Sequence, residues 1–241
     1  MEGNCVNKVF GTSGDRCGWP QAMLFDLDGT LIDSVADIAT SVNLLLAKEN
    51  LPPLSVDEVH AMIGNGMAKL VERAFKARDI VLEGEGLVAM TARMMDIYKD
   101  HLTEETILLE GAEDMLCAYS AAGVRIAVVT NKPEAFSRRI LEHFGLGDVI
   151  HCVVGGDTGP ERKPAPDMLL HAAAELDLHA SKAMMVGDSP ADIGAAVAAG
   201  MVSVAVRGGY TTVPVDELGA DLVIDSLRQL PAAIEKLKEP A

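Results

Sequence analysis

The sequence contains few basic residues, few aromatic residues and no long hydrophobic run. It has 20 Lys and Arg residues against 36 Asp and Glu residues, so its formal net charge is −16. A field of that sign repels nucleic acids and anionic membranes, which argues against both as partners. Without a run of about 18 or more apolar residues, no membrane-spanning helix is predicted. A small anionic ligand would need local positive groups, such as a metal ion, one or two lysines, or helix N-termini.

Cysteine is also scarce. The four cysteines, Cys5, Cys17, Cys117 and Cys152, include no pair with C-x-x-C spacing, and the six histidines lack the spacing of a zinc site. The first 20 residues carry no signal-peptide pattern, so we expect a reduced, cytoplasmic protein. Residues 1–20 are polar and glycine-rich, and we interpret them as a disordered N-terminal extension.

The pattern of apolar residues divides the rest of the chain into two parts. Residues 22–25 are an apolar run that predicts a buried strand, which ends in two aspartates and a glycine. Residues 34–103 show only helical spacing, with capping-box signals at Ser34 and Asp37 and at Ser55 and Glu58. We therefore predict a helical cap over residues 34–103, inserted into an α/β core made of residues 21–33 and 104–241.

From Gly111 onward, strand and helix patterns alternate. Apolar runs predict buried strands at residues 124–129, 149–154, 183–186, 202–206 and 222–224. Helical patterns fall near residues 112–122, 134–144, 166–177, 190–199 and 228–238. With the first strand this makes a doubly wound, mostly parallel, Rossmann-like α/β sheet. Ligands bind at the carboxyl ends of the strands in such sheets.

Polar residues stand directly after four of these predicted strands. The set is Asp26, Asp28 and Thr30, then Thr130, Asn131 and Lys132, then Lys163, then Asp188 and Asp192. Any one of them alone could be a helix cap or a solvated surface residue. Together, Asp26, Asp28 and Asp188 at one sheet edge would repel one another unless a cation offset their charge. An oxygen-rich acidic cluster suits Mg²⁺, so we predict a magnesium site.

Four strings in order resemble the motifs of the haloacid dehalogenase-like phosphohydrolases. They are residues 25–30 (FDLDGT), 128–131 (VVTN), 163–164 (KP) and 187–192 (GDSPAD). The helical segment between the first two resembles the cap of the superfamily's helical-cap branch. Strings at residues 31–34, 51–55, 63–66 and 162–166 resemble the bacterial phosphoglycolate phosphatase group. Residues 208–212 (GGYTT) depart from it, because they lack the Gly-Tyr-Asn type of loop that many members carry.

The resemblance implies a role for each aspartate. Asp26 would be the nucleophile, so that hydrolysis proceeds through an aspartyl-phosphate. Asp28 would protonate the leaving alkoxide and then deprotonate the attacking water. Mg²⁺ would be bound by the Asp26 side chain, the Asp28 backbone carbonyl and Asp188. Asp192 would orient Lys163 or the waters around the metal.

The resemblance also implies how the phosphoryl group is bound. Thr130 and Asn131 would donate hydrogen bonds to phosphoryl oxygens, and Lys163 would supply fixed positive charge. No role is assigned to Asp33 or Lys132.

The predicted substrate is 2-phosphoglycolate, a small phosphorylated metabolite, hydrolysed to glycolate and phosphate by a monomer or homodimer. The helical segment would close over the site as a lid. Its Gly64, Asn65 and Gly66 could supply backbone N–H groups at the start of the next helix, where the helix dipole favours a carboxylate. The same three residues could also be only a turn.

Other functions remain open from the sequence. A haloacid dehalogenase would need neither the second aspartate nor a metal, and sugar phosphomutases of this superfamily usually carry Val where Thr30 stands. A phosphonate hydrolase would need a cap amine, for which the candidates are Lys48, Lys69, Lys76 and Lys99. The non-enzyme alternative is a phosphate-sensing protein with a relict site, although no expected catalytic residue is missing.

Overall fold

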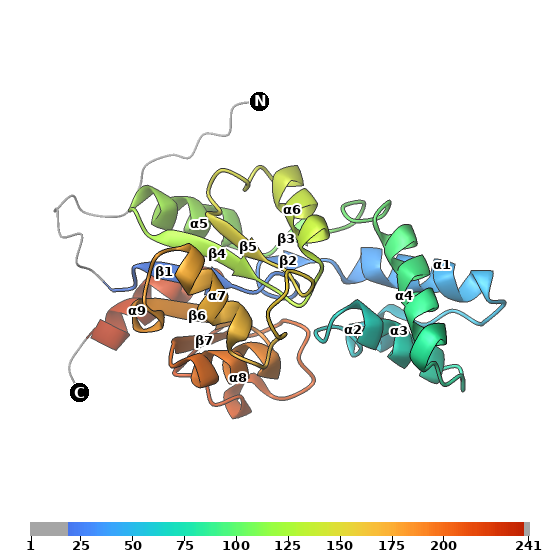
Figure 1. The fold of residues 1–241 in the computed structure, drawn as a ribbon. Coiled ribbons are helices and arrows are strands. Elements are labelled where there is room, and N and C mark those ends of the chain that lie inside the picture. Colours follow the sequence, from blue (N-terminus) through green and yellow to red (C-terminus); the bar gives the residue numbers. More distant parts are fainter. Residues whose placement is uncertain (1–18, 239–241) are drawn as a thin grey trace.

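A six-stranded sheet forms the centre of the computed structural model, which describes residues 19–238 (Figure 1). Its strands are β1 (Ala22–Phe25), β4 (Arg125–Val129), β5 (Cys152–Val154), β6 (Ala183–Gly187), β7 (Val202–Val206) and β8 (Leu222–Ile224). They lie in the order β5-β4-β1-β6-β7-β8, and each neighbouring pair is parallel. The predicted doubly wound sheet is confirmed. Residues 1–18 of the predicted extension, with Cys5 and Cys17, lie outside the described residues.

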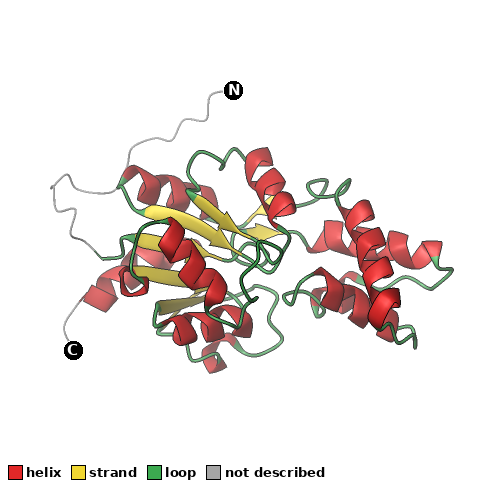
Figure 2. Ribbon diagram, in the orientation of Figure 1, coloured by secondary structure: helices red, strands yellow, loops and turns green. Residues whose placement is uncertain are grey.

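Helices cover both faces of this sheet (Figure 2). One face packs against α5 (Ala112–Ala121), α6 (Glu134–His143) and α9 (Leu230–Lys238), and the other packs against α7 (Asp167–Glu175) and α8 (Pro190–Ala199). Successive side chains of a strand point to opposite faces, so Phe25 joins the first core and Leu24 the second. Burial on both faces explains why these strands are mostly apolar runs in the sequence. Short 3-10 turns occur at Ala180–Lys182, Val215–Glu217 and Leu227–Gln229.

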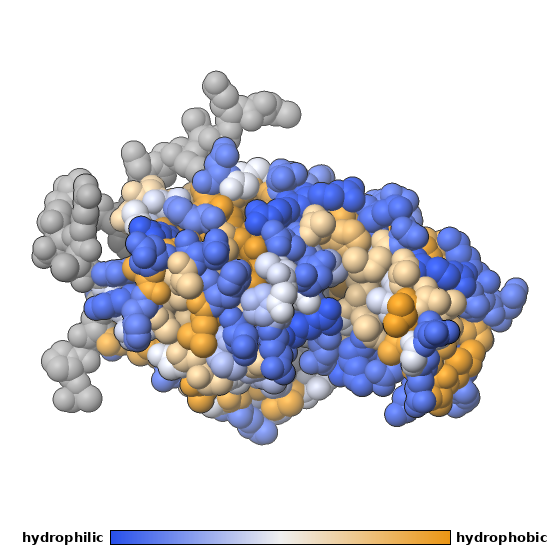
Figure 3. Space-filling model, in the orientation of Figure 1, coloured by the Kyte–Doolittle hydropathy of each residue, from blue (hydrophilic) through white to orange (hydrophobic). Residues whose placement is uncertain are grey.

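A helical bundle extends from the carboxyl end of the sheet (Figure 1). It consists of α1 (Val35–Lys48), α2 (Val56–His60), α3 (Met67–Lys76) and α4 (Gly84–Tyr98). Its buried residues, among them Leu45, Phe75 and Tyr98, belong to the same apolar cluster as one face of the sheet. The inserted helical bundle of the predicted fold is therefore confirmed. Apolar side chains gather at the far end of the bundle, where Val81 and Val88 are exposed (Figure 3).

The two connections to the bundle run side by side as a small antiparallel ribbon of β2 (Ile32–Asp33) and β3 (Ile107–Leu108). The buried Asp37 carboxylate ties them together, because it accepts hydrogen bonds from the backbone N–H groups of Glu105 and Thr106 and from the Thr106 hydroxyl. The sequence analysis did not predict this ribbon, since two-residue strands carry no periodic pattern.

The capping predictions had mixed outcomes. Ser55 and Glu58 form a reciprocal capping box at the start of α2, as predicted. The box predicted at Ser34 and Asp37 is wrong, because Ser34 makes no side-chain cap and instead donates to Asp28. The Ser34 hydroxyl thus bonds to Asp28 and not to the first turn of its own helix.

One strand begins later than its apolar run predicts. The run starts at residue 149, whereas β5 begins at Cys152. The backbone N–H groups of Val149 and Ile150 bond back to the Leu146 carbonyl, so this stretch finishes the turn after α6. No helix among residues 19–238 has the length and apolar character needed to cross a membrane.

Candidate active site

The loop after β1 brings Asp26 to the carboxyl edge of the sheet. The Asp26 backbone N–H bonds to the Val186 carbonyl at 3.0 Å, so this residue continues the ladder between β1 and β6. The loop then turns at Gly29, whose φ is +86°. A Cβ there would lie 2.8 Å from a carboxylate oxygen of Asp188. Glycine therefore permits both the left-handed turn and the close approach of the two loops.

Three carboxylates from two strand ends meet at this edge. Asp26, Asp188 and Asp192 each place an oxygen within 4.8 Å of the others. The Lys163 ammonium donates to Asp26 at 2.9 Å, to Asp192 at 2.6 Å and to the Val129 carbonyl at 2.6 Å. Its side chain is only 1% exposed. One buried lysine thus faces several buried acids.

The acids of this cluster are hard to ionise together. Burial and the nearby Asp192 charge together raise the pKa of Asp26 to about 6, although Lys163 acts in the opposite direction. Burial also raises the pKa of Asp188 well above its usual range, although hydrogen bonds from Tyr210 N–H and the Thr30 hydroxyl oppose this. Carboxylate oxygens in such a set have the donor chemistry that Mg²⁺ prefers, and a divalent cation would offset their charge. The residues present therefore fit that ion.

Asp28 lies apart from this cluster. Its carboxylate accepts two contacts from the Lys132 ammonium, at 2.9 and 3.0 Å, and one from the Ser34 hydroxyl at 2.6 Å. The Lys132 side chain is 3% exposed, and its nitrogen sits 4.8 Å from the centre of the Tyr98 ring. Lys132 is a site residue to which the sequence analysis gave no role. Its position directly after the 128–131 motif was the available signal.

Thr130 and Asn131 follow β4, but their side chains are used differently. The Thr130 hydroxyl oxygen accepts from the Lys132 backbone N–H at 3.2 Å, and its proton remains free to donate. The Asn131 side-chain amide donates to the Gly64 carbonyl at 3.0 Å and to the Lys163 carbonyl at 3.1 Å. Its Oδ1 is buried without a hydrogen-bond partner among the described residues. In this structure the Asn131 side chain therefore joins the bundle to the core.

The loop at residues 64–66 is seated on the core. The Asn65 side chain turns away from the site and accepts from Arg73 at 2.7 Å. Gly66 has φ +82°, and a Cβ on it would lie 2.9 Å from an Arg162 guanidinium nitrogen and 3.2 Å from the Asn131 carbonyl oxygen. Glycine at 66 thus lets the loop approach the core closely.

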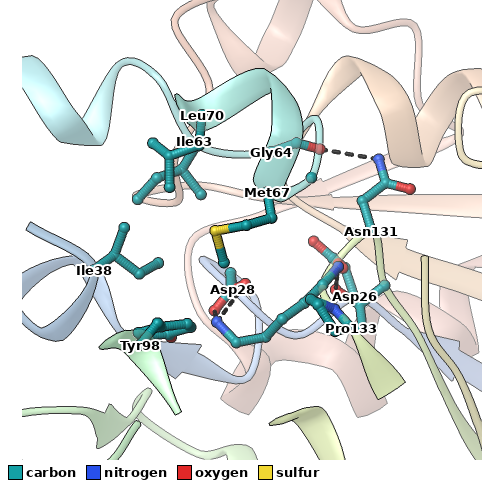
Figure 4. Close-up of a pocket in the computed structure, with 13 residues that line it drawn as sticks. Asp26, Asp28, Ile38, Ile63, Gly64, Met67, Leu70, Tyr98, Asn131 and Pro133 are labelled. Carbon is teal, nitrogen blue, oxygen red and sulfur yellow. Dashed lines mark hydrogen bonds and ion pairs between the residues drawn. The ribbon is translucent and has the colours of Figure 1, made fainter. Parts of the chain in front are cut away.

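A partly open cavity of about 50 Å³ lies between the bundle and the sheet edge (Figure 4). The core contributes Asp26, Asp28, Thr130, Asn131, Lys132 and Pro133. The bundle contributes Ile38, Ile63, Gly64, Gly66, Met67, Leu70 and Tyr98. Polar groups therefore line one side and mostly apolar groups the other. Four of the predicted site residues do not line the cavity. Lys163, Asp188 and Asp192 are grouped around Asp26, and Asn65 is on the bundle.

Tyr210 links the acidic cluster to the connection between core and bundle. Its backbone N–H donates to Asp188 at 2.6 Å, and its hydroxyl donates to Asp33 at 2.8 Å and accepts from Ser34 N–H at 2.6 Å. No role was predicted for Tyr210, although it lies in the segment 208–212 that departs from the phosphoglycolate phosphatase pattern.

Residues 23–206 match the family model described as haloacid dehalogenase-like hydrolase. The chain belongs to this family. A phosphoglycolate phosphatase from Caulobacter vibrioides is 38% identical over 209 residues, covering 87% of this chain and 88% of the relative. One from Rhodospirillum rubrum is 40% identical over 215 residues, covering 88% and 89%. The predicted resemblance is confirmed, and the chain is a phosphatase of this family.

Solved structures have the same fold. A predicted phosphoglycolate phosphatase from Haemophilus somnus superposes with a TM-score of 0.83 at 31% identity, covering 88% of this chain and 97% of that one. CbbY from Rhodobacter sphaeroides, solved in complex with phosphate, gives a TM-score of 0.77 at 25% identity, covering 89% and 99%.

Proposed function

We propose that this phosphatase hydrolyses 2-phosphoglycolate to glycolate and phosphate, with Mg²⁺ and through an aspartyl-phosphate on Asp26. One observation carries the proposal: Asp26, bonded to the Lys163 ammonium at 2.9 Å, and Asp28, paired with Lys132, line the same cavity. This arrangement supplies a nucleophile and a separate acid–base group to one small substrate.

In the proposal, the Asp26 carboxylate attacks phosphorus and the leaving alkoxide departs. Phosphate monoesters resist hydrolysis so strongly that enzymes supply accelerations of up to ~10²¹, and dividing the reaction into two displacements makes each one easier. Lys163 holds Asp26 in place, and the free proton of the Thr130 hydroxyl is available for a phosphoryl oxygen. The attacking carboxylate of Asp26 has to be ionised, and the Lys163 ammonium favours its ionised form.

Asp28 is proposed as the acid and base. It would give a proton to the leaving oxygen and later accept one from the water that hydrolyses the aspartyl-phosphate. Ser34 and Lys132 hold its carboxylate from two sides, so its orientation is fixed before the substrate binds. Fixed orientation is a requirement for efficient proton transfer to a bound group.

Asp26, Asp188 and the Asp28 backbone carbonyl are proposed to hold Mg²⁺. When bound, the ion would neutralise the repulsion between carboxylate and phosphate and polarise a phosphoryl oxygen. Both oxygens of Asp192 are already engaged, one by Lys163 and one by Ser189. Asp192 is therefore proposed to hold Lys163 in place.

The choice of substrate rests on the relatives and on the cavity. The relatives from Caulobacter vibrioides and Rhodospirillum rubrum are phosphoglycolate phosphatases. A small cavity bordered by Gly64 and Gly66 suits a small ester, because a polymeric substrate would hold the bundle away from the core. None of the lysines proposed for a phosphonate hydrolase lines this cavity, which disfavours that alternative.

The test is phosphate release from a panel of small esters, with Mg²⁺ and with EDTA. We expect 2-phosphoglycolate among the best few substrates and loss of turnover with EDTA that added Mg²⁺ restores. Mass spectrometry of acid-quenched enzyme should show one added phosphoryl group on the peptide that contains Asp26. A phosphate-sensing protein would bind phosphate without turnover, and a different preferred ester would contradict the substrate but not the chemistry.

A further inference from the structure

The charged groups of the cavity are distributed unevenly. Where the leaving group would lie, the wall from the bundle is apolar and includes Ile38, Met67 and Leu70 (Figure 4). A neutral leaving group gains contacts there, whereas a charged one loses water and needs a partner. Among the described residues that line the cavity, Lys132 is the one cation.

Lys132 has hydrogen-bonding capacity left over. An ammonium has three donors, and Lys132 bonds to the Asp28 carboxylate and interacts with Tyr98, whose ring centre lies 4.8 Å from its nitrogen. The Tyr98 hydroxyl is itself buried without a hydrogen-bond partner among the described residues. Unsatisfied buried polar groups are rare in folded proteins and require an explanation. An acceptor on the substrate would use both of these donors.

The loop at residues 64–66 is less suited to that task in this structure. The Gly64 carbonyl is occupied by Asn131, and the Asn65 side chain is held by Arg73. Arg162, whose guanidinium lies close to Gly66, is also outside the cavity lining.

We propose that Lys132, assisted by the Tyr98 hydroxyl, binds the carboxylate of the leaving group and selects phosphate esters of small 2-hydroxy acids. This rests on the proposed function. With the ester oxygen at Asp28, the carboxyl carbon of such an acid is two bonds away, and Lys132 is the group bonded to Asp28. Lys132 is then a specificity-determining residue, paired with Asp28 in the free enzyme and shared with the substrate in the complex. The apolar wall strengthens the contact between Lys132 and the substrate carboxylate, because it keeps water away.

The test compares 2-phosphoglycolate with ethyl phosphate, which has a leaving group of similar size without the carboxylate. We expect wild-type enzyme to prefer 2-phosphoglycolate in kcat/KM, and Lys132→Met to reduce that preference by roughly 10- to 100-fold, as expected for loss of a hydrogen bond to a charged group. Lys132→Arg should keep part of it. Lys69→Met, on the exposed surface of α3 and outside the cavity lining, is the matched control and should keep all of it.

Tyr98→Phe provides a second variant in case Lys132→Met does not fold. It removes a hydroxyl without a partner, so the melting temperature should not fall, while KM for 2-phosphoglycolate should rise several-fold and that for ethyl phosphate should not. If Lys132 only orients Asp28, Lys132→Met will slow both esters equally, and the proposal is overturned. It is also overturned if Tyr98→Phe leaves both KM values unchanged. A wild-type enzyme without preference would instead refute the substrate of the proposed function, and this proposal with it.

Discussion

At the scale of single residues, two buried lysines divide the acids of the site into two groups. Lys163 bonds to Asp26 and Asp192, whereas Lys132 bonds to Asp28. Asp26 and Asp28 are two positions apart and on the same loop, yet they have different cationic partners. That division gives one carboxylate the surroundings of a nucleophile and metal ligand, and the other the surroundings of a proton carrier.

The first prediction concerns the nucleophile. Asp26→Asn keeps the size of the side chain and the chance of a contact with Lys163, but an amide does not attack phosphorus. We expect turnover to fall by several decades, with the melting temperature changed little or raised, because a buried carboxylate is removed. Residual activity above about 1% of wild type, in an assay of phosphate release, would contradict the covalent mechanism.

The second prediction separates proton transfer from metal binding. Asp28→Asn keeps the backbone carbonyl, so Mg²⁺ affinity should change little while turnover falls by roughly 10²–10⁴. Asp188→Asn should instead weaken Mg²⁺ binding, because Asp188 lies in the acidic cluster. Isothermal titration with Mg²⁺ on both variants, beside phosphate-release kinetics, makes the comparison. The reverse pattern would show that the two roles have been exchanged.

At the scale of elements, the bundle is joined to the core at two places. The β2–β3 ribbon, the Asp37 carboxylate and the Tyr210 hydroxyl fix the base of the bundle. At its other contact, the loop at residues 64–66 meets the core through Asn131. A bundle held at one end and hydrogen-bonded at the other is suited to opening and closing over a small substrate.

The third prediction tests this contact. Gly66→Ala places a Cβ in the space now bounded by Arg162 and the Asn131 carbonyl, at φ +82°. We expect the loop to be displaced and kcat/KM to fall by about 10-fold, in addition to a cost of about 1 kcal/mol in stability for the left-handed backbone.

Gly84→Ala is the matched control for that prediction. Gly84 also has positive φ, +52°, but nothing lies within 4 Å of the added Cβ. It should lower the melting temperature without changing kcat/KM. Equal kinetic effects of the two variants would mean that contact between the loop and the core is not required for activity.

At the scale of the whole molecule, the strands and the inserted bundle were predictable because each has a local pattern in the sequence. Apolar runs identified six strands, and polar residues after them identified the edge where Asp26, Lys163 and Asp188 meet. The hydrogen-bond partners of the site residues could not be predicted from the sequence. Lys132 reaches Asp28 across 104 positions and Tyr210 reaches Asp33 across 177, and no spacing in the sequence indicates such pairs.

The overall charge also bears on metal binding. A net charge of −16 attracts Mg²⁺ to the whole protein surface. Binding of Mg²⁺ at one site therefore has to be distinguished from screening of the surface charge by Mg²⁺. The acidic cluster offers a way to do so. Because burial raises the pKa of Asp26 to about 6, its ionisation opposes folding of the metal-free protein. Stability from this group is greatest below the unfolded pKa of about 3.9 and falls as pH rises to about 6.

The last prediction follows from the raised pKa values of the acidic cluster. Mg²⁺ binds the ionised carboxylates, so below a pH of about 6 protons compete with it at Asp26 and at Asp188, whose pKa is also raised. The rise in melting temperature on adding Mg²⁺ should therefore be small at pH 5.5 and larger at pH 8. Thermal unfolding at both pH values, with NaCl at matched ionic strength as the comparison, measures the specific part. Asp188→Asn should reduce that part at pH 8. A rise that is equal at the two pH values, or that survives in Asp188→Asn, would mean that Mg²⁺ acts by screening the surface charge and that the cluster does not hold it.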